Sequence, residues 1–182
     1  MDTANLWAPW RMSYIRQLAA SPDKPPTDPG CFLCRAGETE PHSPAAREQF
    51  ILHHTEHGVL MLNRYPYTNG HLLVAPLVHA GELSDLSPAI RGDLMELTEL
   101  GSRLLQAAIH PQGINIGINM GRCAGAGVPG HLHIHLVPRW NGDTNFMHTI
   151  GQVHVIPQAL EESHSWLSEV LKKLLADSSN EK

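Results

Sequence analysis

The sequence lacks the features that mark three large classes of protein. No stretch among its 182 residues approaches the roughly 20 consecutive apolar residues that span a membrane. Lys and Arg number 13 against 18 Asp and Glu, and the resulting net charge of −5 is opposite to the basic excess of proteins that bind nucleic-acid backbones. Three cysteines, an odd number, do not make a disulfide framework. The charged amino terminus, interrupted by Pro9, lacks the pattern of a secretion signal.

These absences predict a soluble, cytoplasmic protein whose partners include neither a membrane nor a nucleic-acid polymer. The composition, 42% hydrophobic and 17% charged, is that of an ordinary globular domain. A chain of this length buries about two-thirds of its unfolded surface, so it can form a core without disulfides. Histidine is the exception, because its 13 copies equal Lys and Arg together. Since imidazole ligates metals and attacks phosphorus near neutral pH, the histidines are the first candidates for function.

The order of apolar segments predicts an α+β fold with an antiparallel sheet of about five strands. A long helix is expected between strands, starting near Ser87, which can cap it, and stopping before Pro111. A second helix is expected over 157–176, where apolar residues recur at helical spacing. Short apolar or alternating runs indicate strands at 49–52, 58–62, 71–78, 113–120, 131–139 and 152–156.

The chain divides into three parts by composition. An aromatic-rich segment at 5–18 and a proline-rich stretch at 21–30 predict an N-terminal arm and linker over residues 1–30. The main domain is assigned to residues 31–157, and it is expected to open with a short knuckle and a loop. Residues 158–182 are assigned to the C-terminal helix and tail.

Three alternating histidines form the most informative pattern. Because side chains on a strand alternate faces, His131, His133 and His135 are expected on one face, about 6.6 Å apart, with the aliphatic residues between them facing the core. The preceding segment, 121–130, is glycine-rich, and such loops let backbone N–H groups surround an anion. The combination indicates chemistry at phosphorus with one histidine as nucleophile. The plainer alternative is a solvated polar face of an edge strand.

A second alternative for the three imidazoles is a catalytic metal site. Histidines that alternate along a strand can bind one ion. At this spacing only adjacent members could easily share it, and the hypothesis predicts that chelators abolish activity.

Cys31 and Cys34 form a Cys-x-x-Cys pair, which is typical of a redox site or of half a zinc site. No thioredoxin-like βαβ pattern surrounds the pair, which disfavours redox chemistry. The two further zinc ligands would come from distant histidines, with His79 and His131 as candidates. Two idle thiols are the alternative, and Cys123 receives no role.

Several other polar residues have an ordinary explanation. Asn63 and Asn119 stand where turns are expected, and Asn is a common turn former. Arg139 could reach a phosphate but is more typically a surface charge. The remaining histidines are expected on the surface: His42, His53, His54, His57, His110, His148, His154 and His164.

The stretch HLHIHLVPR at 131–139 resembles the motif of the histidine triad (HIT) superfamily. The resemblance extends to NRYPYTNGHLLVAPLVH at 63–79, to LWAPWRMSYI at 6–15 and to CFLC at 31–34, and so covers most of residues 5–157. Together these segments are similar to bacterial diadenosine tetraphosphate phosphorylases and their hydrolase relatives. The resemblance implies a HIT-like fold.

The resemblance also implies roles for individual residues. His133 would attack the α-phosphorus and become a nucleotidyl-histidine, His135 would hold the phosphate oxygens, and His71 would be an accessory histidine. Many relatives carry a polar Gln or Ser in the loop before the triad, which this chain lacks, so backbone amides would have to stabilise the α-phosphate. The implied nucleotide or phosphate contacts are Asn63, Asn119, Gly125, Gly127, Val128 and Gly130.

The zinc-bearing branch of the family implies a metal site and an assembly. Cys31, Cys34, His79 and His131 match its four ligands, with the zinc structural and remote from bond making. No organic cofactor is implied. Members of the family form homodimers by joining two sheets edge to edge, and the same is expected here.

The sequence therefore favours cleavage of a nucleotide phosphoanhydride through a covalent intermediate. The leading hypothesis is phosphorolysis of a dinucleoside polyphosphate such as diadenosine tetraphosphate, an ATP adenylyltransferase-like reaction. Water in place of phosphate as the acceptor would make the protein a dinucleoside polyphosphate or nucleoside phosphoramidate hydrolase. A weakly catalytic nucleotide-binding module is the remaining alternative.

Overall fold

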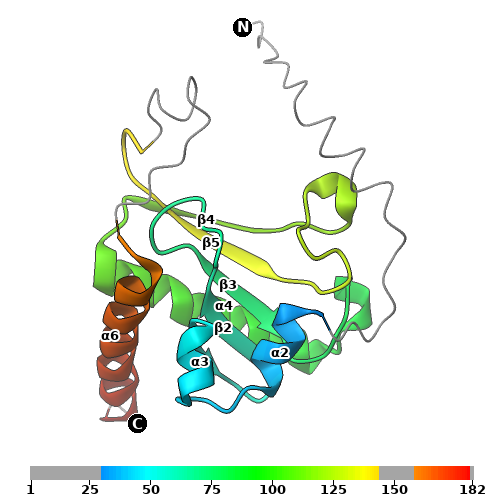
Figure 1. Cartoon of the computed structure of the whole chain (residues 1–182), viewed down its shortest axis with the longest axis horizontal. Coiled ribbons are helices and arrows are strands. Elements are labelled where there is room, and N and C mark those ends of the chain that lie inside the picture. Colours follow the sequence, from blue (N-terminus) through cyan, green and yellow to red (C-terminus); the bar gives the residue numbers. More distant parts are fainter. Residues whose placement is uncertain (1–29, 144–157, 181–182) are drawn as a thin grey trace, which may run out of the picture.

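The computed structural model describes residues 30–143 and 158–180, and these form an α+β fold around one five-stranded sheet (Figure 1). All neighbouring strands are antiparallel, and the strand order is β1-β2-β3-β5-β4. The predicted fold class is confirmed. The strand expected at 152–156, the arm at 5–18 and most of the linker lie outside the described residues. The strands are β1 (Ile51–His54), β2 (Gly58–Leu62), β3 (Leu72–Pro76), β4 (Gly113–Ile118) and β5 (Ile134–Arg139).

The long helix α4 (Pro88–Ile109) begins and ends where the sequence predicts. The Ser87 side chain accepts a hydrogen bond from the backbone of Ile90, and Pro88 occupies the first turn, where a missing N–H costs nothing. The C-terminal helix α6 (Leu160–Asn180) begins three residues later than predicted and continues further. None of the described helices is long and apolar enough to cross a membrane.

The segment expected to be a knuckle and a loop instead contains two short helices, α2 (Phe32–Glu38) and α3 (Pro44–Glu48). The prediction of a knuckle was wrong. The segment has few apolar residues, but those it has, Leu33, Ala36 and Ala46, are buried against the sheet. The remaining helical turns are η1 (Leu83–Asp85) and η2 (Arg122–Ala124).

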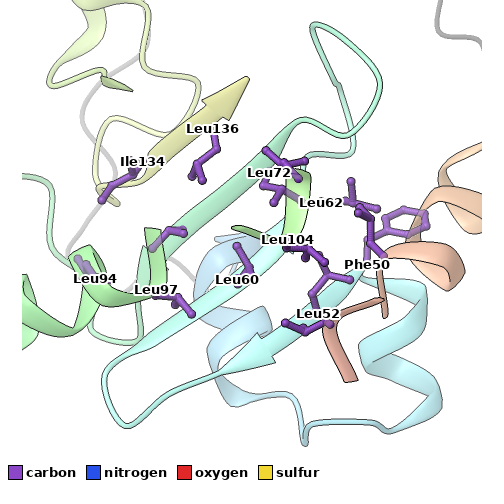
Figure 2. Packing of buried hydrophobic residues seen from close by; sticks show 14 of the residues in the cluster. Phe50, Leu52, Leu60, Leu62, Leu72, Leu94, Leu97, Leu104, Ile134 and Leu136 are labelled. Atoms are coloured by element: carbon purple, nitrogen blue, oxygen red, sulfur yellow. The ribbon is translucent and has the colours of Figure 1, made fainter. Parts of the chain in front are cut away.

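Helices on both faces explain why β2 and β3 are buried at every position. Leu60 and Leu62 face α4 and α6 in the larger core cluster, which Figure 2 shows together with Leu72 and Leu136. The helix α4 lies so close to the sheet that a Cβ on Gly101 would stand 3.0 Å from a methyl of Leu136. On the opposite face α2 packs on β2 and α3 on β1, around Val59, Met61 and Leu73.

Four of the five strands have bounds that differ from the prediction, and for β1 and β5 the structure gives the reason. β1 includes His53 and His54, which lie beyond the strand predicted at 49–52, because both residues pair with β2. β5 begins at Ile134 instead of residue 131, because the chain before it is bound elsewhere: the N–H of Leu132 donates to the Ala80 carbonyl at 2.6 Å. This departure from the sheet separates the first histidine of the triad from the other two.

Candidate active site

The three histidines lie opposite the aliphatic residues that alternate with them, but they do not form one row. His133 and His135 are neighbours, with ring centroids 4.8 Å apart. The ring of His131 turns away to pack edge-on against His79 at 5.0 Å. His131 lies with Cys31, Cys34 and His79 and not with the other two histidines. The described residues therefore do not support the hypothesis that all three imidazoles hold one catalytic metal.

Backbone geometry fixes the protonation of His133. Its Nδ1 lies 2.9 Å from the carbonyl oxygen of His131. A carbonyl only accepts, so Nδ1 must carry the proton and donate it. The lone pair is therefore on Nε2, which is the nitrogen available as a nucleophile.

A second backbone group fixes His71 and, through it, His135. The Tyr67 N–H donates to Nδ1 of His71 at 3.1 Å, so the proton of His71 is on Nε2. That Nε2–H donates to Nδ1 of His135 at 3.0 Å, which leaves the His135 proton on its own Nε2. This last N–H is buried and has no hydrogen-bond partner in the described part of the chain. The site thus presents an acceptor nitrogen on His133 and a donor N–H on His135.

Asn63 follows β2 and supports the same arrangement. Its Oδ1 accepts from the Tyr65 N–H at 3.0 Å, so its amide NH₂ is free to face His71, whose Nδ1 is 3.3 Å away. Asn119 follows β4 directly and is half-buried. The register that pairs Ile118 with Ile134 brings Asn119 to the level of His133.

Burial keeps the imidazoles of the site neutral at pH 7. Desolvation, followed by the neighbouring His135 and His133, lowers the pKa of His71 from 6.5 to about 3. Desolvation and the charge of His133 lower the pKa of His135 to about 4. Desolvation also lowers the pKa of His133, opposed by its hydrogen bond to the His131 carbonyl. A neutral His133 is the form with a free lone pair.

The glycine-rich loop between β4 and β5 has an open part and an anchored part. Gly125 has a φ of +90°, and no atom lies within 4 Å of where its Cβ, or that of Gly127, would be. At the other end the Val128 carbonyl accepts from the His131 N–H at 3.2 Å. A Cβ on Gly130 would stand 3.3 Å from Nε2 of His79. The anchored end therefore rests on His131 and His79, two of the candidate zinc ligands.

The four residues named as zinc ligands come together: the ligand atoms of Cys31, Cys34, His79 and His131 lie within 4.8 Å of one another. Nδ1 of His131 is 3.4 Å from both sulfurs, and Nδ1 of His79 is 3.1 Å from the Cys34 sulfur. Nε2 of His131 donates to the Pro76 carbonyl at 2.9 Å, which turns the Nδ1 lone pair toward the sulfurs. Two thiols and two imidazoles in this arrangement fit a tetrahedral metal site.

Comparisons with known proteins agree with this geometry. A family model described as the HIT domain matches residues 45–142. The AP-4-A phosphorylase of Mycobacterium tuberculosis is 38% identical over 164 residues, covering 90% of this chain and 82% of that protein. The asymmetrical bis(5'-nucleosyl)-tetraphosphatase of Schizosaccharomyces pombe is 31% identical over 93 residues, covering 51% of this chain and 50% of that protein. The chain belongs to the HIT family.

A solved structure of a HIT family protein is also similar. The zinc-bound histidine triad family protein from Mycobacterium smegmatis superposes with a TM-score of 0.64 at 28% identity, covering 81% of this chain and 97% of that chain. The resemblance to the HIT family and the HIT-like fold are therefore confirmed.

The structure of this HIT protein adds one residue that the sequence analysis missed. The Tyr67 ring lies 4.6 Å from that of His71 and stacks on His135 at 5.9 Å, and its backbone sets the His71 tautomer. Only its place four residues before His71 could have drawn attention to it. Arg139 bonds Asp143 and Asn115, so its guanidinium is engaged on the surface.

Of the other histidines, all expected on the surface, His42 and His110 are exposed, whereas His53, His54 and His57 are partly buried. His148 and His154 lie outside the described residues, and the expectation was wrong for His164. His164 is buried, because α6 packs its first turns on β1: its Nε2 bonds the Ile51 carbonyl at 2.8 Å, and its ring meets Phe50 edge-on. Helical spacing places this imidazole on the same face as Leu167 and Leu171, so the sequence pattern itself indicates a buried His164.

Replacing His71 should change how stability depends on pH. The folded-state pKa of His71, about 3, lies below its usual 6.5, so the unfolded chain takes up this proton first. The stability contributed by neutral His71 is complete above about pH 6.5 and is lost as pH falls toward about 3. In urea titrations from neutral to acid pH, the wild-type free energy of unfolding should fall more steeply than that of His71→Asn, by up to about 1.4 kcal/mol per pH unit. Parallel curves would contradict this assignment.

Proposed function

We propose that this protein cleaves dinucleoside polyphosphates by transferring a nucleotidyl group to His133 and then to inorganic phosphate. The observation that carries the proposal is the pairing of two imidazoles with opposite hydrogen-bonding character. His133 offers the Nε2 lone pair, because its Nδ1–H is held by the His131 carbonyl. Beside it, His135 offers an N–H that has no hydrogen-bond partner among the residues that the structure describes.

In the first step Nε2 of His133 attacks the α-phosphorus of diadenosine tetraphosphate. A P–N bond forms, the bridging P–O bond breaks, and its electron pair leaves with ATP. The imidazole becomes positively charged, and the His131 carbonyl stabilises that charge through Nδ1–H. The His135 Nε2–H is placed to donate to a phosphate oxygen as negative charge develops there.

In the second step an acceptor oxygen attacks the phosphorus of the AMP–histidine and restores neutral His133. Phosphate as acceptor gives ADP, and water gives AMP. The phosphorylase name of the Mycobacterium tuberculosis relative supports phosphate. We further propose that the backbone amides of the loop at Gly125, Gly127, Val128 and Gly130 hold the α-phosphate, with Asn63 and Asn119 as nucleotide contacts.

A hydrolase is the second candidate. The tetraphosphatase name of the Schizosaccharomyces pombe relative supports it. Both reactions share the first step, so they differ only in which acceptor enters.

His133→Asn should abolish turnover of diadenosine tetraphosphate, with a loss of roughly 1,000-fold or more because the nucleophile is removed. His42→Asn, which changes an exposed imidazole in a turn, is the matched control and should keep wild-type activity. Products are separated by anion exchange with and without inorganic phosphate. ADP and ATP that appear only with phosphate support phosphorolysis, AMP and ATP without it support hydrolysis, and a fully active His133→Asn would overturn the mechanism.

We propose that the Cys/His cluster binds one structural zinc ion. The donor set fits, and a zinc-bound relative supports the assignment. The metal would take no part in bond making, but it would act on the proposed nucleophile indirectly, since the carbonyl of the ligand residue His131 accepts the Nδ1–H of His133. Bound zinc would fix the His131 ring, and the chain itself would then hold that carbonyl in place.

Zinc analysis and thermal unfolding test this site together. Protein purified without chelators should contain about one zinc per chain, and Cys34→Ser should lose it. The variant should unfold roughly 10 °C or more below wild type, because the site contributes several kcal/mol to folding. Cys123→Ser, which changes an exposed thiol, is the control. Wild-type protein with only traces of zinc would refute the proposal.

We propose that the chain forms a homodimer through β4. Among the described strands, β4 is the outer edge of the sheet next to β5, and none of them pairs with its other side. Ile116 and the nearby Met120 are 50% and 48% exposed, an apolar surface suited to a second copy.

Ile116→Lys should convert the dimer to a monomer, because it places a charge on the proposed contact. Met95→Lys, at a more exposed apolar residue on α4, should leave the dimer intact. Sedimentation velocity measures both. A wild-type monomer at all concentrations would exclude the dimer.

A further inference from the structure

The connection between β2 and β3, residues 63–71, carries the accessory histidine and is fastened at two places. At one place the Thr68 hydroxyl donates to the Pro138 carbonyl at 3.0 Å, which ties the connection to β5. At the other, the side chain of Asn69 reaches the start of α6. The HIT family model ends at residue 142, so α6 lies outside the matched region.

The contact with α6 is a triangle of three polar side chains. Oγ of Ser163 lies 3.2 Å from Oδ1 of Asn69 and 2.9 Å from Oε1 of Gln158. The Asn69 amide NH₂ donates to the same Gln158 oxygen at 3.3 Å. Ser163 is only 3% exposed. A buried hydroxyl contributes little to the burial of apolar surface. Its hydrogen bonds instead fix the position of α6 relative to its partners.

The segment between this triangle and His71 has little freedom to absorb movement. Gly70 has a φ of +79°, and a Cβ there would stand 2.7 Å from a methyl of Ile109, so the backbone passes tightly over α4. The His71 N–H donates to the Thr68 carbonyl at 3.3 Å, and the Tyr67 N–H donates to the His71 ring. A shift of Asn69 therefore moves the donor that sets the His71 tautomer.

We propose that Asn69, Gln158 and Ser163 form a latch through which α6 positions His71, and thereby the His135 N–H, for the reaction. The three latch side chains are positioning residues, since they act through His71 and do not touch the reacting atoms. The consequence for turnover rests on the proposed function, whereas the structural coupling from α6 to His71 does not.

The first test is kinetic. Ser163→Ala should lower kcat for diadenosine tetraphosphate roughly three- to tenfold, the rate equivalent of one ordinary hydrogen bond, with KM little changed. Ser165→Ala is the control, because the Ser165 hydroxyl on the same helix donates to the Glu161 carbonyl and accepts from Arg47, neither of which belongs to the latch; it should have wild-type kcat. In a His71→Ala background, Ser163→Ala should cause no further loss, because its effect passes through the missing imidazole. Equal losses in both backgrounds would overturn the latch.

The second test does not need a substrate. Amide hydrogen exchange at Tyr67 and His71, followed by NMR, should be faster in Ser163→Ala than in wild type or Ser165→Ala. Unchanged exchange at these two amides would overturn the latch whatever the substrate is. Faster exchange without turnover by wild-type protein would instead reject the proposed function and retain the coupling. Faster exchange with unchanged kcat would reject a positioning role in catalysis.

Discussion

The candidate site depends on one hydrogen bond, from Nδ1 of His133 to the backbone carbonyl of His131. This bond decides which nitrogen of His133, the proposed nucleophile, carries the free lone pair, and the carbonyl that accepts it is itself fixed by several contacts. The His131 ring is held between the two cysteine sulfurs and the Pro76 carbonyl. The backbone N–H of His131 donates to the Val128 carbonyl. The residue that supplies the carbonyl thus belongs to the Cys/His cluster, so this cluster supports the orientation of His133.

A second chain of hydrogen bonds, which begins at the Tyr67 N–H, sets the opposite polarity on the neighbouring imidazole. A backbone donor makes Nδ1 of His71 an acceptor, and the preference is passed through Nε2–H to His135. Backbone groups cannot change their donor or acceptor character, so they fix the tautomers more firmly than side chains could. Two identical side chains 4.8 Å apart consequently differ in function, one with a lone pair and one with a proton to donate.

The sequence allowed the local features to be predicted, because they depend on short-range rules. The alternation of residues 131–139 predicts which side chains reach the core, and Ser87 with Pro88 predicts the start of α4. The division of the triad could not be predicted from alternation, because it depends on contacts between residues about 100 positions apart, such as Cys31 and His131. Tyr67 could not be predicted either, because it sets the His71 tautomer through its backbone N–H. Every residue except proline has this group, so the residue type carries no signal.

The buried N–H of His135 connects stability with binding. Within the part of the chain that the structure describes, this N–H has no partner, and leaving a buried donor without one generally costs about 1–3 kcal/mol, because its bond to water is lost. The neighbouring elements hold it there nonetheless, through the bond from His71 and the stacked Tyr67 ring. A phosphate oxygen that accepts this hydrogen recovers the lost interaction, and the recovery grows as charge builds up on that oxygen. In the proposed reaction, the hydrogen bond that His135 Nε2–H does not make within the described part of the chain would therefore form as the substrate reacts.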